Sequence, residues 1–152
     1  MTQLPRRLLT AVVGASLLAG ACGGDAATDA STDARAGDVI EAAPGIRVVT
    51  AAEGAAIRTS PPDGLVVLDV RTPEEFRDGH LEGATMIDFY EADFEAQLAL
   101  LDKDAPYLLY CRSGNRSGQT RAIMEELGFT DVADVGGGIL AWVDAGLPVV
   151  SP

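Results

Sequence analysis

The sequence has few of the residues that bind metals or cross-link a chain. Only one of its 152 residues is histidine and only two are cysteine. These numbers exclude a zinc finger or another site built from several Cys and His ligands, and they allow at most one disulfide. Aromatic residues are also scarce, at 5%.

The sequence also has few basic residues. Eleven lysine and arginine residues face 23 acidic ones, so the formal net charge is −12. A nucleic-acid-binding protein needs a basic face to meet phosphates, and this balance argues against one. Apolar residues make up 47% and charged residues 22%, which is a globular composition. The length is that of one domain.

The first 21 residues contain no acidic side chain. Arg6 and Arg7 precede fourteen uncharged residues, 8–21, which end in the small residues Ala19, Gly20 and Ala21. Fourteen residues rise about 21 Å as a helix, less than the roughly 30 Å of a membrane core. The pattern therefore predicts a secretory signal peptide over residues 1–21 rather than a permanent membrane span.

The residue after this segment is Cys22, and the segment resembles a bacterial lipoprotein signal. The resemblance implies a lipidated Cys22 at the mature N-terminus, a domain exported to the cell envelope, and membrane attachment through the lipid alone. One departure is that the position three residues before the cysteine, where the family prefers Leu, is Ala19. Cleavage near Ala21 that leaves a free Cys22 is the alternative.

Residues 22–45 form the next segment. They are mostly Gly, Ala, Ser, Thr and Asp, with Val39 and Ile40 as the main exceptions, and their net charge is −4. Such a segment buries too little apolar surface to offset the entropy of ordering it. We predict a flexible acidic tether.

The pattern changes at Ile46, where short apolar runs begin to alternate with helical patterns. A domain is therefore predicted over residues 46–152. The expected strands are 46–49, 65–68, 84–88, 105–110 and 132–135, and the expected helices are 50–58, 73–78, 92–101, 117–127 and 139–145. Capping-box patterns begin the first two helices, at residues 50–53 and 72–75. This order predicts an α/β fold with a central parallel five-stranded sheet and helices on both faces.

Chemistry is concentrated in residues 111–117 (CRSGNRS), which we call the cysteine loop. Cys111 follows a buried strand directly and precedes a helix, where backbone amides can form an anion-binding nest. Arg112 and Arg116 add positive charge, and Gly114 permits a tight turn. Such surroundings lower a thiol's pKa and favour the nucleophilic thiolate.

Three segments resemble the rhodanese-homology family. They are residues 67–76 (VLDVRTPEEF), 79–84 (GHLEGA) and the cysteine loop, and the tail at 136–149 is also typical. The resemblance covers about residues 46–148. It implies a single rhodanese-like domain with sulfurtransferase activity and with neither a metal nor an organic cofactor.

The resemblance also implies roles for individual residues. Cys111 would attack a small anionic sulfur donor such as thiosulfate and carry a persulfide, which a thiol or a protein acceptor removes. The residues expected to bind the donor and stabilise the persulfide are Arg112, Ser113, Gly114, Asn115, Arg116 and Ser117. Asp69 and Arg71, at another strand end, are expected to shape the site by pairing with each other or with the cysteine loop.

Two other functions remain as alternatives. The chain would be a non-turnover persulfide carrier or sulfur-sensing module for an envelope partner, or a phosphatase or arsenate reductase. The phosphatase layout needs five residues between Cys and Arg, whereas four separate Cys111 from Arg116 and Ser117 stands where that Arg would be. The shorter loop favours sulfur transfer.

Overall fold

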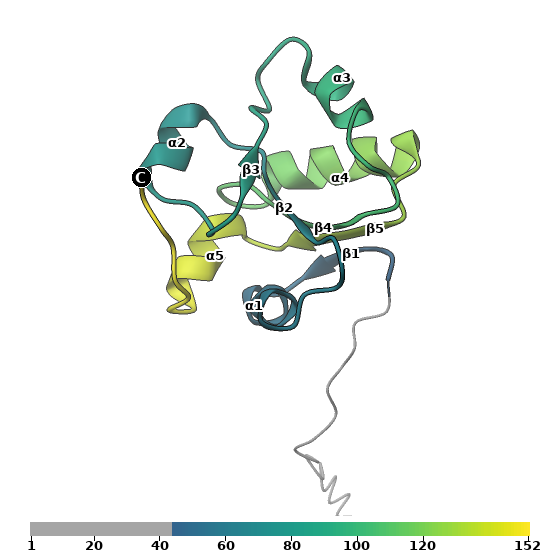
Figure 1. Ribbon diagram of the computed structural model, residues 1–152. Coiled ribbons are helices and arrows are strands. Elements are labelled where there is room, and N and C mark those ends of the chain that lie inside the picture. The colour runs from purple at the N-terminus through teal and green to yellow at the C-terminus, as the bar shows by residue number, and fades with distance from the viewer. Residues whose placement is uncertain (1–43) are drawn as a thin grey trace, which may run out of the picture. The chain divides into compact units, whose positions relative to one another are not determined.

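The structure, a computed structural model, describes residues 44–152. The predicted signal peptide, Cys22 and nearly all of the predicted tether lie outside the described residues. Within them the strands are β1 (Ile46–Val49), β2 (Val66–Asp69), β3 (Thr85–Met86), β4 (Pro106–Tyr110) and β5 (Asp131–Val135). The helices are α1 (Ala51–Thr59), α2 (Pro73–Asp78), α3 (Phe94–Ala99), α4 (Asn115–Leu127) and α5 (Gly138–Asp144). Figure 1 shows their arrangement.

The five strands form one parallel sheet in the order β1-β5-β4-β2-β3. The predicted five-stranded parallel sheet is thus confirmed. Strand β4 lies at its centre, with Leu109 opposite Leu68 of β2 and Asp134 of β5. Because all strands run the same way, the residues that follow β2, β4 and β5 meet at one edge of the sheet.

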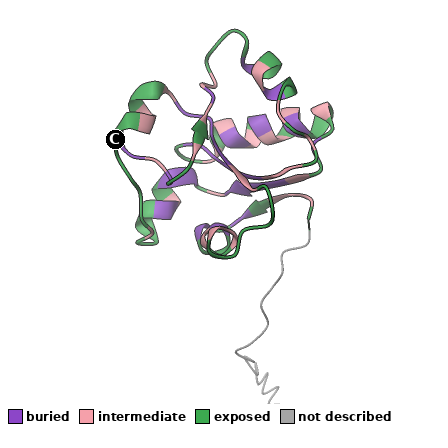
Figure 2. Ribbon diagram, viewed as in Figure 1, coloured by how far each residue is buried: buried purple, intermediate pink, exposed green. Residues whose placement is uncertain are grey.

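Helices cover both faces of the sheet, as predicted. Helices α3 and α4 pack on one face, where Leu98 and Met124 meet Leu109, and α1 and α5 pack on the other, where Trp142 meets Leu108. Successive β4 residues thus point to opposite cores, so this strand is apolar throughout. Figure 2 shows the buried residues along the sheet and on the helix sides that face it.

Both predicted capping boxes are present. The Thr50 and Thr72 side chains accept from the backbone N–H groups of Glu53 and Glu75, whose carboxylates accept from the threonine amides in return. Each box satisfies two amides that a helix start would otherwise leave unpaired. The second box also fixes the position of Glu75 beside the cysteine loop.

Some element boundaries differ from the prediction. Helix α4 begins at Asn115, two residues early, because Gly114 adopts a left-handed conformation and turns the chain directly into the helix. Strand β3 is only two residues long, because its pairing with β2 covers just Thr85 and Met86. No helix among residues 44–152 is long and apolar enough to cross a membrane.

Two isolated residues have structural roles. His80 Nδ1 lies 2.9 Å from the Phe76 carbonyl oxygen, within hydrogen-bonding distance, and its ring stacks on Phe76. Trp142 is 1% exposed and donates to the Pro148 carbonyl, so it belongs to the core.

Candidate active site

Cys111 is the first residue after the central strand β4. It is 1% exposed and is a free thiol. The chain leaves the strand here, turns at Gly114 with φ +94°, and enters α4 one residue later. The topology therefore places the thiol at the middle of the sheet's carboxyl edge.

Hydrogen-bond donors surround the sulfur. The Gly114 amide donates to Sγ at 3.1 Å, and the Ser113 and Ser117 amides and the Ser117 hydroxyl also face it. We call these four donors the amide cradle. Burial raises the pKa of the Cys111 thiol, but the cradle outweighs burial and the pKa lies below its usual value. The arrangement stabilises a thiolate, as the sequence indicates.

The beginning of α5 holds the other side of the cysteine loop. The amides of Ile139 and Leu140 donate to the carbonyl oxygens of Cys111 (2.9 Å) and Arg112 (3.1 Å). A Cβ on Gly138 would overlap the Cys111 carbonyl oxygen, and Gly138 has φ +59°. The glycine run at 136–138 is therefore packed directly against the loop.

The two arginines of the loop have different surroundings. The Arg116 guanidinium donates to both carboxylate oxygens of Glu75, at 2.7 and 2.8 Å, and lies over the Tyr90 ring. The Arg116 hydrogen bond, against a smaller opposing effect of burial, lowers the pKa of Glu75 to about 2. Arg112 is exposed and makes no ion pair with any described residue.

A pocket of about 450 Å³ lies over the cysteine loop. It is lined by Thr72, Glu75, Tyr90, Arg112, Ser113, Asn115 and Arg116. The volume is in the range of small-molecule sites. The structure thus brings the four polar loop residues predicted at 112, 113, 115 and 116 to one pocket, whereas Gly114 and Ser117 face the sulfur and do not line the pocket.

Asp69 and Arg71 pair with each other rather than with the cysteine loop. Arg71 Nη2 lies 2.6 Å from Asp69 Oδ2, and both side chains are almost fully buried. Arg71 also donates to the Gly79 carbonyl and lies over the Tyr110 ring. The pair joins the ends of β2 and β4 beneath the site, and neither residue lines the pocket.

Sequence reasoning missed Asp134, a buried carboxyl in β5 that the sheet register places next to β4. Burial raises the pKa of Asp134, against the opposing effects of Ser117 and Arg121. Ser117 Oγ and Asp134 Oδ1 are both buried without a hydrogen bond of ordinary geometry. The Ser117 hydroxyl is therefore close enough to influence the pKa values of both the thiol and this carboxyl, although it makes no hydrogen bond of ordinary geometry to either. Only the strand register could have indicated this contact.

Glu75 and Tyr90 were also missed as site residues. Glu75 was recognised only as the end of a capping box, and its contact with Arg116 spans 41 positions of sequence. Nothing in the sequence pattern marks Tyr90, which stands in the loop before α3.

Comparison with known proteins identifies the class. Residues 53–145, more than half of the chain, match the rhodanese-like domain family. A sulfurtransferase of Allochromatium vinosum is 33% identical over 95 residues, covering 62% of this chain and 87% of that protein. The thiosulfate sulfurtransferase PspE of Escherichia coli is 37% identical over 70 residues, covering 46% and 67%. A rhodanese-related protein from Thermoplasma volcanium superposes with a TM-score of 0.61 at 30% identity, covering 70% of this chain and 99% of that one.

The chain therefore belongs to the rhodanese family. It is a sulfurtransferase of the rhodanese type, and its single α/β domain has the fold of its solved relatives.

Proposed function

We propose that Cys111 carries the transferred sulfur, and that the donor is a small anion of the thiosulfate type. The Cys111 thiolate attacks the outer sulfur of thiosulfate, the S–S bond of the donor breaks, and sulfite leaves with the bonding electron pair. The product is a Cys111 persulfide anion. A nucleophilic acceptor, a thiol or a protein group, then takes the outer sulfur and regenerates the thiolate.

The amide cradle is the observation that supports this role. Four donors converge on one buried sulfur, and the pKa of the thiol is lowered although burial opposes this. A persulfide is also an anion, so the donors that stabilise the thiolate are suited to the loaded form. Two relatives are named as sulfurtransferase and thiosulfate sulfurtransferase, which agrees with a thiosulfate-type donor.

The arrangement of Arg116 argues against phosphatase chemistry. A phosphatase needs a guanidinium to bind the phosphate that its cysteine attacks, but Glu75 engages both terminal nitrogens of Arg116. Sulfur transfer does not need that arginine free, because the amide cradle binds the reacting sulfur.

The test is the mass of the full chain after incubation with thiosulfate. We expect a gain of one sulfur, about 32 Da by atomic mass, which cyanide removes and which Cys111→Ser does not show. Steady turnover with cyanide would identify an enzyme acting on free donors, whereas a single slow transfer would identify a carrier. No gain with thiosulfate or with mercaptopyruvate would refute the proposal.

We further propose that the domain is exported and lipid-anchored. Support comes from the sequence alone: the uncharged stretch over residues 8–21, the small residues before Cys22, and the acidic segment that follows. Expression in a bacterium fed a labelled fatty acid should label the chain and place it in the membrane fraction. Cys22→Ser should lose both the label and the membrane association, and a wild-type chain without label would refute the anchor.

A further inference from the structure

The pocket over the cysteine loop contains three charged side chains among the described residues: Arg112, Arg116 and Glu75. With a pKa of about 2, Glu75 is ionised at any physiological pH. The pocket lining therefore carries one net positive charge rather than the two that its arginines alone would give.

The position of Glu75 is fixed from two sides. Its Oε2 accepts from the Thr72 amide at 3.1 Å in the capping box, while both oxygens accept from Arg116. The Arg116 side chain is 12% exposed and that of Glu75 is 25% exposed, so water screens this pair only partly. Because Glu75 is held by its own helix start, it stays beside Arg116 when an anion enters the pocket.

Donors of the thiosulfate type differ in charge. Thiosulfate carries two negative charges at neutral pH, whereas a thiosulfonate, in which an alkyl group replaces one oxygen, carries one. Each negative charge of a bound donor is attracted by the arginines and repelled by Glu75, and the dianion feels this repulsion twice.

We propose that Glu75 is a specificity-determining residue that weakens the pocket's preference for doubly charged sulfane-sulfur donors over singly charged ones, because it neutralises Arg116 at the pocket. This inference rests on the proposed function, since it concerns the donor that Cys111 attacks. The substrates it adds are monoanions with a terminal sulfur, such as thiosulfonates or persulfides of small thiols, which compete better with dianions when Glu75 is present.

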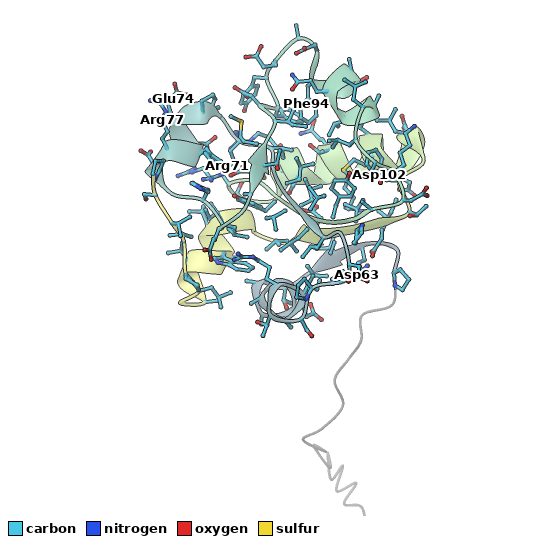
Figure 3. The ribbon with its side chains drawn as sticks, in the orientation of Figure 1. Asp63, Arg71, Glu74, Arg77, Phe94 and Asp102 are labelled. Carbon is cyan, nitrogen blue, oxygen red and sulfur yellow. The ribbon has the colours of Figure 1, made fainter. Side chains whose placement is uncertain are left out.

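The variant Glu75→Gln isolates the charge. Glutamine at the third helical position keeps the capping hydrogen bond, and it has nearly the same shape. The matched control is Glu74→Gln, one position away. Glu74 is exposed and pairs with Arg77 at 3.1 Å, and Figure 3 shows both at the outer side of α2.

The experiment measures kcat/KM of the full chain for thiosulfate and for methanethiosulfonate. In Glu75→Gln the kcat/KM for thiosulfate divided by the kcat/KM for methanethiosulfonate should rise about tenfold at low salt. The rise should be smaller in high salt. In Glu74→Gln the ratio should change less than twofold. A ratio is unaffected by a loss of folded protein, since both donors meet the same sample. An unchanged ratio in Glu75→Gln would overturn the inference.

A second measurement separates this inference from the proposed function. Sulfate and methanesulfonate carry two charges and one, and neither donates sulfur. Their protection of Cys111 against alkylation, read on the peptide that contains Cys111, reports anion binding without transfer. If wild type never forms a persulfide, the proposed function fails. If sulfate, relative to methanesulfonate, protects Cys111 better in Glu75→Gln than in wild type, Glu75 still selects ligands by charge. If the relative protection is the same in both proteins, the inference about Glu75 is refuted.

Discussion

The inner side of the cysteine loop presents mainly backbone groups, whereas its outer side presents side chains. Around the Cys111 sulfur, three of the four donors of the amide cradle are backbone N–H groups. At the pocket above it, the electrostatics come from side chains, namely Arg112, Arg116 and Glu75. Reactivity of the sulfur thus depends on how the chain turns, and selection of the donor depends on which side chains line the pocket.

This difference has a physical reason. Backbone amides are present whatever the side chains are, so a loop held in one conformation keeps a stabilised thiolate. Side-chain charges can be exchanged without altering the turn. A single domain can therefore keep one chemical step and change its donor, and the two regions should respond to different substitutions.

The largest effect is expected from distorting the loop. In Gly138→Ala the new methyl group would overlap the Cys111 carbonyl oxygen at a position with φ +59°. We expect about 10²-fold loss of sulfur transfer, because displacing a reacting group by about 1 Å has that effect. Gly146→Ala is the control, since Gly146 has φ +72° but no atom within 4 Å of the added Cβ. Equal losses of activity in the two variants would show that loop packing is not responsible.

The next effect concerns the one cradle donor that is a side chain. Ser117→Ala removes the hydroxyl that helps to lower the pKa of Cys111. Without this hydroxyl, burial is opposed by fewer donors, so the pKa of Cys111 should rise. The rate of Cys111 alkylation as a function of pH measures it. Ser113→Ala keeps its backbone amide and should leave the pKa unchanged, and an unchanged pKa in Ser117→Ala would contradict the assignment.

A smaller effect is expected at the pocket. Arg112 makes no ion pair within residues 44–152, so Arg112→Gln should raise the KM for an anionic donor by about tenfold. It should leave the pKa of Cys111 unchanged, which separates the two regions. Arg77→Gln, on the outer side of α2, changes the net charge equally and should leave the KM within twofold. A similar KM rise in both variants would indicate long-range attraction instead.

Sequence patterns were sufficient for the cradle and insufficient for the pocket. Strand, cysteine, glycine and helix follow one another within residues 106–127, so local reasoning gave the thiol, the turn and the amide donors. The fold also followed from local signals, because apolar strands, capping boxes and glycine stops are all short-range. Element ends were less accurate where pairing decides them, as at the two-residue β3.

The pocket depends on contacts between distant positions. Glu75 reaches Arg116 from the start of α2, and Asp134 reaches Ser117 from β5. Sequence reasoning assigned both arginines to the anion, whereas within residues 44–152 Arg112 makes no ion pair and Arg116 pairs with Glu75. Such pairing follows from the order of strands in the sheet, which no local pattern contains.

The smallest expected effect is that of the Glu75–Arg116 pair on stability. The folded-state pKa of Glu75 is about 2, below its ordinary 4.5, chiefly because of Arg116. A lowered pKa means that the Glu75–Arg116 pair contributes stability above pH 4.5, and that this contribution is lost as the pH falls toward 2. Since the pair is partly exposed, its contribution is at most about 1 kcal/mol, or about 4 °C in unfolding temperature.

Unfolding temperatures of wild type, Glu75→Gln and Glu74→Gln between pH 7 and pH 3 test this prediction. The unfolding temperature of wild type should be higher than that of Glu75→Gln at pH 7. The difference should narrow below pH 4.5, because only wild type has a Glu75–Arg116 ion pair to lose. Glu74→Gln should follow wild type throughout, since its ion pair is exposed. A gap that stays constant with pH would mean that Glu75 stabilises the domain by shape and capping alone. Glu75 would then act as a structural residue. The distinction between a cradle that depends on the fold of the chain and a pocket that depends on side-chain charge would not hold at this position.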